Sequence, residues 1–359
     1  MPNPGVLRRN PFKFAVQTLL ALLAAIRSLC ILVKNNIYDF LTQKWTAIPL
    51  SQTEITRTNG IMGISLVLAV LLAAADLNLA QYCEKNHEQD WSYHGYLNAP
   101  DDWREFFPAC EEKSSPIRMF TDNMKNERNV TKLIFIQYDV PVIRAEMVND
   151  GRTVILTPRD SVKRGILHDG HEYTLQHMQF HFGSTDRPGA EHTINHIRYP
   201  MEIQFIHKNA ENRYANVALL VDVSDHLQIV KHHSVGFYFL MTSVYAQMEI
   251  NHAFDPILEV LPEVTFKDDS TKLRSPLILE ALLPESPASF YRYTGTLTTP
   301  PCDEAVWHVL RTTTCLGRHQ LDLFLRLYSV KREDASPECL MKENYSPAER
   351  NDRDVCASQ

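Results

Sequence analysis

The sequence has no excess of basic residues, little cysteine and no long uninterrupted apolar run. Its 36 Lys and Arg residues are outnumbered by 43 Asp and Glu residues, which gives a formal net charge of −7 at pH 7. This balance excludes the basic surface that nucleic-acid-binding proteins use to neutralise phosphates, so we expect no nucleic-acid partner. No hydrophobic tail precedes the C-terminal Gln359, so we also expect no lipid anchor at that end.

Two apolar runs in the first quarter of the chain differ from everything that follows. The run from Phe14 to Val33 is interrupted by Gln17 and Arg27, so it fits an amphipathic helix as well as a membrane span of about 20 residues. The run from Ile61 to Ala75 has the length of a signal-peptide core and ends in three alanines suited to cleavage. We therefore expect entry into the secretory pathway through the second run, followed by cleavage or by retention as a membrane tether.

The chain is expected to have three parts. Residues 1–60 form an N-terminal extension of uncertain role with one apolar segment, residues 61–80 a signal peptide or signal anchor, and residues 81–359 the main domain. The main domain would then be secreted or would lie on the extracellular face of a membrane.

Cysteine and glycosylation signals agree with export. Six of the seven cysteines follow Ala75, and an even count beyond a signal predicts a disulfide framework. These six are Cys83, Cys110, Cys302, Cys315, Cys339 and Cys356. Two Asn-X-Ser/Thr triplets, at Asn129 and Asn344, are compatible with N-glycosylation.

The stretch from Leu175 to Asn209 predicts two strands and a connector. Side chains alternate between the faces of a strand, so His177, Gln179 and His181 share one face of the first strand. Glu202, Gln204 and Ile206 share one face of the second strand in the same way. The connector contains turn-forming residues and the polar triplet Glu191-His192-Thr193.

Two motifs of the main domain resemble those of the α-class carbonic anhydrases. Phe180–Ser184, Ala190–Thr193 and Glu202–His207 are similar to the segments that hold the family's catalytic zinc. The segment Tyr293–Cys302, YTGTLTTPPC, is similar to the family's Gly-Ser-Leu-Thr-Thr-Pro-Pro segment. The similarity spans roughly residues 90–356. It implies a β-dominated α+β fold, which is a single domain with a large, twisted, mostly antiparallel central sheet and short peripheral helices.

The zinc-ligand positions depart from the family pattern. Three histidines hold the metal in the family, whereas the matching residues here are Gln179, His181 and Gln204, so only His181 is retained. A neutral amide oxygen is a weaker zinc ligand than imidazole, thiolate or carboxylate. We therefore expect no cofactor, and zinc only if a rearranged site joins His181 to Glu202 or to an amide.

A metal-free arrangement is the favoured interpretation of this centre. His177 shares a face with His181, but the two are roughly 13 Å apart along the strand, too far for easy chelation. The Gln204 amide could instead donate to Glu202, which would satisfy both buried groups without a metal.

Several further residues match positions with roles in the family. Thr298 and Glu191 match the pair that orients the zinc-bound hydroxide, and Arg152 stands where a histidine shuttles protons. A guanidinium stays protonated at neutral pH, so Arg152 could not serve as a shuttle. The remaining matches are the wall of the carbon dioxide pocket (Ile206, Leu219, Leu297, Val306, Trp307), the residues that support the ligands (Glu202, His192) and a disulfide between Cys110 and Cys302.

Three functional hypotheses follow. The first is a protein without hydratase activity, similar to the carbonic-anhydrase-related proteins, that binds an extracellular or membrane protein partner. The second is a zinc-dependent carbonic anhydrase with a rearranged or weakened metal site, which would slowly hydrate carbon dioxide to bicarbonate or cleave esters. The third is a structural role outside the cell. Bound zinc would separate the second hypothesis from the other two.

Overall fold

The structure is a computed structural model, and it describes residues 91–93, 99–110, 115–126, 132–185, 187–224, 250–349 and 355–358. The chain divides into two compact units, Met1–Ala74 and Ala75–Gln359, and all described residues belong to the second. Both apolar runs and Asn129 therefore lie outside the described residues. Within the described ranges, no helix combines the length and the apolar character needed to cross a membrane.

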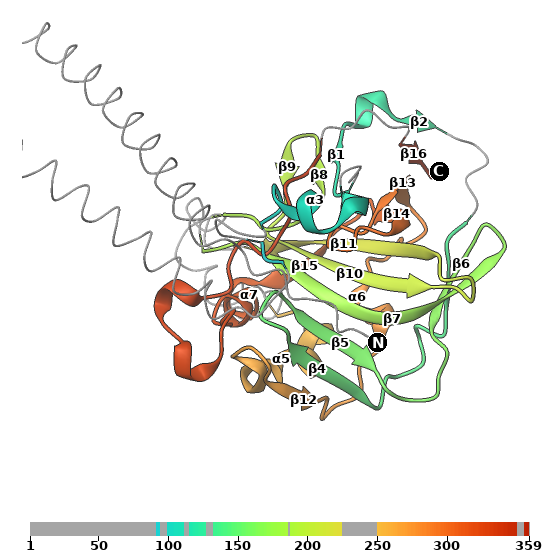
Figure 1. The fold of residues 1–359 in the computed structure, drawn as a ribbon. Helices are drawn as coiled ribbons and strands as arrows, with labels where there is room; N and C mark the ends of the chain where they lie inside the picture. The colour runs from blue at the N-terminus through green and yellow to red at the C-terminus, as the bar shows by residue number, and fades with distance from the viewer. Residues whose placement is uncertain are drawn as a thin grey trace, which may run out of the picture. The chain divides into compact units, whose positions relative to one another are not determined.

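A 13-stranded sheet forms the centre of the described domain (Figure 1). Its main path runs in the spatial order β12 (Ser270–Lys272), β4 (Ala145–Asn149), β5 (Val154–Pro158), β7 (His171–Phe182), β10 (Met201–Lys208), β11 (Tyr214–Ser224), β14 (Glu304–Leu310), β13 (Phe290–Thr296), β16 (Cys356–Ala357) and β2 (Lys125–Asn126). Beside this path, β15 (Thr314–Gly317) pairs with β11, and β3 (Ile134–Ile136) pairs with β6 (Gly165–His168), which also pairs with β7. A separate 3-stranded sheet consists of β1 (Arg118–Met119), β8 (Thr193–Ile194) and β9 (Ile197–Arg198).

Most neighbouring strands of the large sheet are antiparallel, but β11 pairs in parallel with both β14 and β15. The described helices are short, and the longest is α7 (Arg318–Phe324). The others are α3 (Trp103–Phe106), α5 (Asp255–Leu258), α6 (Leu279–Leu282) and the 3₁₀ turns η1 (Pro108–Cys110), η2 (Thr121–Asn123), η4 (His252–Phe254), η5 (Leu261–Val264), η6 (Arg332–Asp334) and η7 (Pro337–Cys339). The sheet-dominated fold with short helices that the sequence predicts is confirmed.

The strand register arranges side chains of one sheet face into three rows. Paired residues of neighbouring strands point to the same face, so each row crosses several strands. The rows are His181–Glu202–Leu220, then Gln179–Gln204–Ala218–Val309, and then the pairs His177–Ile206 and Asn216–Trp307. The central polar residues of β7 and β10 are therefore direct neighbours.

Apolar side chains pack on both faces of the sheet. The larger core lies on the face opposite these rows and includes Phe180, Phe205 and Leu219. A smaller core lies on the same face as the rows and includes Ile206 and Trp307. The polar residues of the rows are thus enclosed by apolar packing, and Gln204 is fully buried.

A disulfide joins Cys110 to Cys302, as the sequence resemblance implies. It closes a loop of 192 residues, and in the chain-entropy account a loop of this length stabilises the fold by roughly 4–5 kcal/mol. Cys339 is also disulfide-bonded. Cys315 is an exposed free thiol, so the expected framework does not include every cysteine that follows Ala75.

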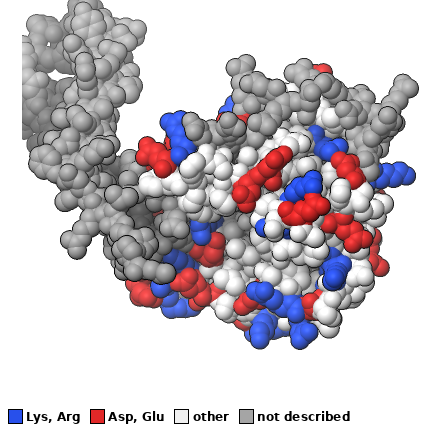
Figure 2. Space-filling model, turned by 45° about the vertical axis from the view of Figure 1, so that its right-hand side comes forward, with Lys and Arg blue, Asp and Glu red and all other residues white. Residues whose placement is uncertain are grey.

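Charged residues of both signs are interspersed on the face of the domain shown in Figure 2. No broad field of one sign covers the described part of this face, which agrees with the modest net charge of −7. The surface in view therefore offers no strongly basic region that would neutralise a phosphate backbone.

Candidate functional site

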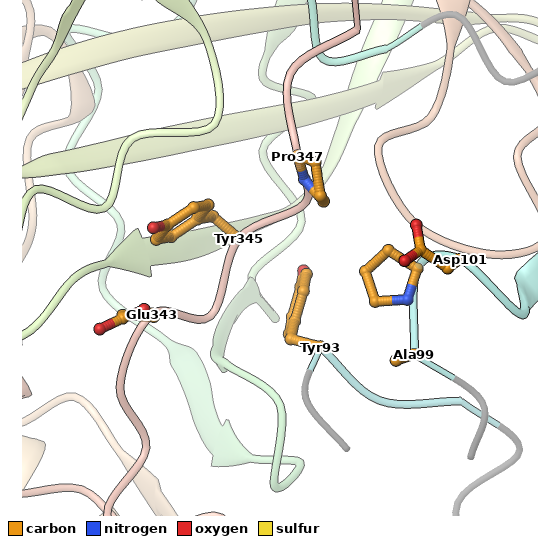
Figure 3. Close-up of a pocket in the computed structure, with 7 residues that line it drawn as sticks. Tyr93, Ala99, Asp101, Glu343, Tyr345 and Pro347 are labelled. Atoms are coloured by element: carbon orange, nitrogen blue, oxygen red, sulfur yellow. The ribbon is translucent and has the colours of Figure 1, made fainter. Parts of the chain in front are cut away.

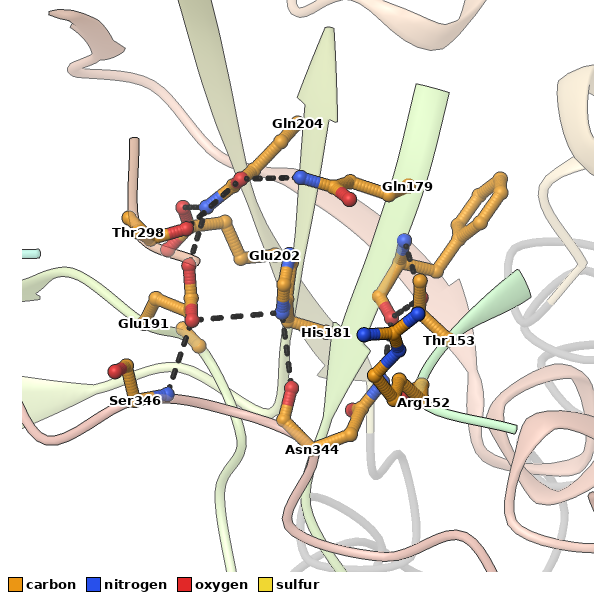
Figure 4. A network of polar contacts seen from close by, with 12 residues as sticks. Arg152, Thr153, Gln179, His181, Glu191, Glu202, Gln204, Thr298, Asn344 and Ser346 are labelled. Atoms are coloured by element: carbon orange, nitrogen blue, oxygen red, sulfur yellow. Dashed lines mark hydrogen bonds and ion pairs between the residues drawn. The ribbon is translucent and has the colours of Figure 1, made fainter. Parts of the chain in front are cut away.

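The residues at the three zinc-ligand positions lie together on β7 and β10, and all are buried or nearly so. Gln179 lies directly opposite Gln204, and His181 lies directly opposite Glu202. His181, Gln204 and Glu202 are all 0% exposed. We call these four residues, with Glu191 and Thr298, the candidate centre (Figure 4). Strand alternation alone accounts for this placement, because each pair occupies one face at one register position.

The Gln204 side chain lies at the middle of the candidate centre. Its Nε2 donates to Glu191 Oε2 at 2.6 Å and to Glu202 Oε1 at 2.9 Å. Its Oε1 accepts from Gln179 Nε2 at 3.1 Å and from Thr298 Oγ1 at 3.4 Å. The orientation of the amide follows from its partners, since ionised carboxylates only accept hydrogen bonds and must face the NH₂ group. One amide therefore joins four side chains, as Figure 4 shows.

These residues do not fit zinc. Three protein ligands drawn from imidazole, thiolate and carboxylate hold a hydrolytic zinc, whereas the three ligand positions here offer one imidazole and two amides. The described residues contain no group of three or more His, Cys, Asp or Glu side chains arranged to hold a metal. The Gln204 amide is also committed to four hydrogen bonds, all of which would have to break before its oxygen could turn toward an ion.

His181 keeps one feature of a ligand histidine. Its Nδ1 lies 2.9 Å from the carbonyl oxygen of Asn344, and this contact fixes the ring. Its Nε2 is buried and has no hydrogen-bond partner in the described part of the chain. A buried nitrogen without a partner is costly, and metal-binding histidines are held through the opposite nitrogen in this way.

A second series of hydrogen-bonded groups, which begins at His192, holds Glu202 in place. His192 donates from its backbone N to Glu202 Oε2 and places Nδ1 near Oε1, both at 2.8 Å. The Tyr293 hydroxyl lies 2.7 Å from His192 Nε2 and 3.0 Å from Ser115 Oγ. Burial alone would raise the pKa of Glu202, but the charge and hydrogen bonds of His192 lower that pKa to about 2. Glu202 is therefore held as a buried carboxylate.

Thr298 and Glu191, the retained orienting pair, are not bonded to each other. The Thr298 hydroxyl donates to Gln204 Oε1, while Glu191 accepts from Gln204 Nε2 and from the backbone N of Ser346 at 3.0 Å. Gln204 thus separates the two residues. The direct contact that the sequence resemblance implies is replaced by a contact through an amide.

The residues predicted for the pocket wall lie on both faces of the sheet. Ile206, Leu297 and Trp307 pack in the core on the same face as Gln204. Leu219 and Val306 pack in the core of the opposite face, because each stands one residue out of phase with the wall. Placing them in the pocket was therefore wrong.

Asn216 is a polar residue of this face that the sequence argument missed. It is 0% exposed and lies beside Trp307 in the register. Its Oδ1 accepts from the backbone N of His207, whereas its Nδ2 has no partner among the described residues. The apolar packing on this face is thus interrupted by a carboxamide.

Arg152, at the position of the proton shuttle, packs against the N-terminal aromatic residues. Its guanidinium lies 4.1 Å from the centroid of the Trp91 ring, and its Nε lies 3.4 Å from Asp150 Oδ2. Its carbonyl oxygen accepts from Asn344 Nδ2 at 2.9 Å. These contacts give Arg152 a packing role beside the candidate centre.

Asn344 is buried, which corrects the expectation of a glycan at this position. The residue is 2% exposed, and its Oδ1 accepts from the backbone N of Phe182. Its Nδ2 donates to the carbonyl oxygens of Arg152 and Phe180, both at 2.9 Å. Glycosylation would attach a sugar to this nitrogen, so the folded domain is incompatible with a glycan there.

A pocket of about 330 Å³ opens close to the candidate centre. Its lining includes Tyr93, Asp101, Glu343, Tyr345 and Pro347, and the Tyr93 side chain points between the others in Figure 3. Burial raises the pKa of Tyr93 well above its usual value, so the hydroxyl stays protonated. The edge of this ring also faces His181, with the ring centroids 6.1 Å apart.

Comparison with known proteins points to one family. The profile of the eukaryotic-type carbonic anhydrases matches residues 98–359. The chain is 29% identical to carbonic anhydrase 6 of Homo sapiens over 66% of this chain and 74% of that protein. It is 31% identical to carbonic anhydrase 6 of Mus musculus over 65% and 71% of the two chains. It is also 28% identical to putative carbonic anhydrase 5 of Caenorhabditis elegans over 82% and 92%.

Proposed function

The chain belongs to the eukaryotic-type carbonic anhydrase family, and we propose that it is a member without hydratase activity that acts by binding another protein. The observation that carries the proposal is the Gln204 amide, which donates to Glu191 and Glu202 and accepts from Gln179 and Thr298. This arrangement gives the carboxylates, the Gln204 amide and Thr298 hydrogen-bond partners without an ion, and His181 Nε2 alone of the ring nitrogens and carboxylates in this centre has no partner among the described residues.

The charges of the candidate centre support the same proposal. Two buried carboxylates, Glu191 and Glu202, face the side chain of residue 204, which matches a zinc-ligand histidine of the family. Here the partial positive charge of one NH₂ group faces them, helped by His192 and by the backbone N of Ser346. Each carboxylate thus has donors in place, and catalysis that requires a metal-bound hydroxide has no support from these residues.

An extracellular location is part of the proposal. The Cys110–Cys302 disulfide supports it, because disulfides persist in oxidising compartments. The apolar run from Ile61 to Ala75 provides the expected entry signal. The partner would then be an extracellular or membrane protein.

One observation favours a second candidate, a weak zinc-dependent carbonic anhydrase. His181 Nε2 is buried without a partner, as a ligand nitrogen would be in the absence of its metal. Glu202 could supply a second ligand only by giving up hydrogen bonds from His192 and Gln204.

Metal content and carbon dioxide hydration of the full-length chain test the proposal. We expect the natural chain, after incubation with zinc and removal of excess metal, to carry far less than one zinc per chain and to show no hydration above background. The variant Gln179→His with Gln204→His should bind zinc. The matched control Gln176→His adds a histidine to an exposed position of the same strand and should behave like the natural chain. One zinc per natural chain together with measurable hydration would establish the second candidate instead.

Partner binding needs a separate measurement. The full-length chain is displayed on cells and cross-linked to its neighbours at the cell surface. We expect the same cross-linked partner protein for the natural chain and for the variant Gln179→His with Gln204→His. If neither the natural chain nor the variant gave a cross-linked product, the structural role would be favoured over the binding role.

A further inference from the structure

A buried pair of histidines lies away from the candidate centre, on the opposite face of the sheet. His168 ends β6 and His308 lies in β14, and they are 2% and 0% exposed. His168 Nδ1 and His308 Nε2 are 3.0 Å apart, and the rings meet edge to face at 72°. The pair joins the tip of the β6–β7 hairpin to the middle of the sheet.

The hairpin tip has a second attachment to the sheet beside this pair. Asp169 and Gly170 form the turn with positive φ values of 47° and 79°, which suits a two-residue hairpin. Asp169 Oδ2 accepts from Arg292 Nη2 of β13 at 2.7 Å and lies 3.1 Å from His168 Nε2. The tip is thus held through Asp169 and through His168.

The pair has too few protons for its contacts when both rings are neutral. The outer nitrogens face acceptors, since His168 Nε2 is near Asp169 Oδ2 and His308 Nδ1 is 3.1 Å from the carbonyl oxygen of Asn216. With a proton on Nδ1 of each ring, His168 donates to His308 Nε2 across 3.0 Å and His308 donates to Asn216, while the contact of His168 Nε2 with Asp169 lacks a proton. Three contacts need three protons, whereas two neutral imidazoles carry two.

The surroundings decide how readily a third proton is accepted. Burial is the largest effect and lowers the pKa of His168 to about 4 and that of His308 to about 3. The other groups that act on the pair are Asp169 in the turn, His171 on β7, Arg292 on β13 and His207 on β10, and Tyr173 on β7 lies beside the His168 ring. Only Asp169 favours a positive charge on His168. The closed hairpin therefore resists protonation, whereas exposed imidazoles accept protons near pH 6.5.

We propose that His168 and His308 form an acid-sensitive latch that holds the β6–β7 hairpin tip closed at neutral pH and releases it on acidification. When the tip leaves the sheet, His168 and the Nε2 of His308 meet water, and each ring binds one proton below about pH 6.5. The open form then gains up to two protons, so acid favours opening. This goes beyond the proposed binding role and does not depend on it, because no group of the candidate centre takes part.

Hydrogen exchange of the full-length chain tests the latch. Peptides that cover residues 165–175 are followed between pH 7 and pH 5, and the rates are corrected for the intrinsic pH dependence of exchange. Uptake of up to two protons predicts an opening constant that rises up to about a hundredfold per pH unit at the acid end of this range. The variant His308→Gln should reduce that slope to about tenfold per pH unit.

Two further variants make the result decisive. His168→Gln removes the other member of the pair and should reduce the slope as His308→Gln does, which guards against misfolding of one variant. His171→Gln replaces an exposed histidine of the same hairpin and should leave the slope unchanged. A variant that speeds opening equally at every pH would show a packing role only, and an unchanged slope in both variants of the pair would overturn the proposal.

Discussion

The two faces of the central sheet each bury a polar cluster, and they satisfy it in different ways. In the candidate centre, the amides of Gln179 and Gln204 supply donors and acceptors that do not change with pH. On the opposite face, His168, His308 and His207, which we call the histidine corner, depend on protons that burial keeps away. His207 Nδ1 has no partner among the described residues, and the same is true of His181 Nε2 in the centre.

The difference between the two clusters follows from the hydrogen-bonding groups of glutamine and histidine. An amide always has two N–H groups and an acceptor oxygen, so one residue can face carboxylates and donors at once. An imidazole has one donor and one acceptor when neutral, so a buried histidine often leaves a contact unfilled. Glutamine at positions 179 and 204 therefore links the carboxylates of the candidate centre to Thr298 through amide hydrogen bonds.

Removing the Gln204 amide should cause the largest loss of stability among the variants considered for the two polar clusters. The variant Gln204→Leu removes one donor from Glu191 and one from Glu202, and it leaves Gln179 and Thr298 without this acceptor. The loss of one hydrogen bond at each of two buried carboxylates predicts a fall of about 3–5 kcal/mol in the free energy of unfolding. Urea unfolding at pH 7 measures this loss. The control Gln176→Leu, at an exposed position of β7, should change it by no more than about 0.5 kcal/mol. A loss below 1 kcal/mol for Gln204→Leu would show that the network contributes little.

Acidification should reduce the contribution of the histidine corner to stability before it affects that of the candidate centre. The buried histidines have lowered pKa values, with His207 at about 3, so the unfolded chain binds protons first as the pH falls below about 6.5. Each such histidine predicts a loss of about 2 kcal/mol between pH 7 and pH 5. The pKa of Glu202, about 2, keeps its contribution intact in that range, and this contribution is lost only as the pH falls from about 4.5 toward 2.

The variant His207→Gln checks the assignment of the acid response. The fall in the free energy of unfolding from pH 7 to pH 5 should shrink by about 2 kcal/mol, and the exposed His171→Gln should leave it unchanged. If His207→Gln had the same pH dependence as the natural chain, the histidine corner would not be the source of acid sensitivity.

Local patterns in the sequence predict the candidate centre better than the contacts around it. Alternation along β7 and β10 is enough to place Gln179, His181, Glu202 and Gln204 on one face, and the register has them there. The face of Leu219 is set by its phase in β11, and the sequence resemblance assigned it to the wrong face.

Contacts between distant parts of the chain have no local signal. His168 and His308 are 140 residues apart in sequence, and neither has a neighbour that marks it as part of a pair. Asn344 has the sequence of a glycosylation signal, yet its amide is buried against Arg152 and Phe180. Such roles depend on the assembled sheet, so only the structure shows them.

Removing the Tyr293 hydroxyl, which contacts His192 and Ser115, should reduce stability by a smaller amount. Tyr293→Phe removes the hydroxyl between His192 Nε2 and Ser115 Oγ and leaves both buried groups with one partner fewer. We expect a loss of about 1–2 kcal/mol in the free energy of unfolding, measured with urea at pH 7. Tyr291→Phe on the same strand is the control, because no hydrogen bond of its hydroxyl is found in the described part of the chain. Equal losses in the two variants would mean that the contacts of the Tyr293 hydroxyl with His192 and Ser115 contribute nothing beyond the removal of a buried hydroxyl.

The smallest effect is expected at Arg152, beside the centre. Its guanidinium lies over the Trp91 ring at 4.1 Å, and Arg152→Met keeps the aliphatic stem but removes the charge. The Arg152 side chain is 22% exposed. A cation–π contact that is not fully desolvated contributes about 0.5–1 kcal/mol, so thermal unfolding should shift by only a few degrees. Arg152→His places an imidazole at the position of the proton shuttle and, in the natural chain, should give no carbon dioxide hydration, because Gln179 and Gln204 remain. Hydration gained by Arg152→His alone would contradict the proposed absence of hydratase activity, because the amides of Gln179 and Gln204 would then not prevent it.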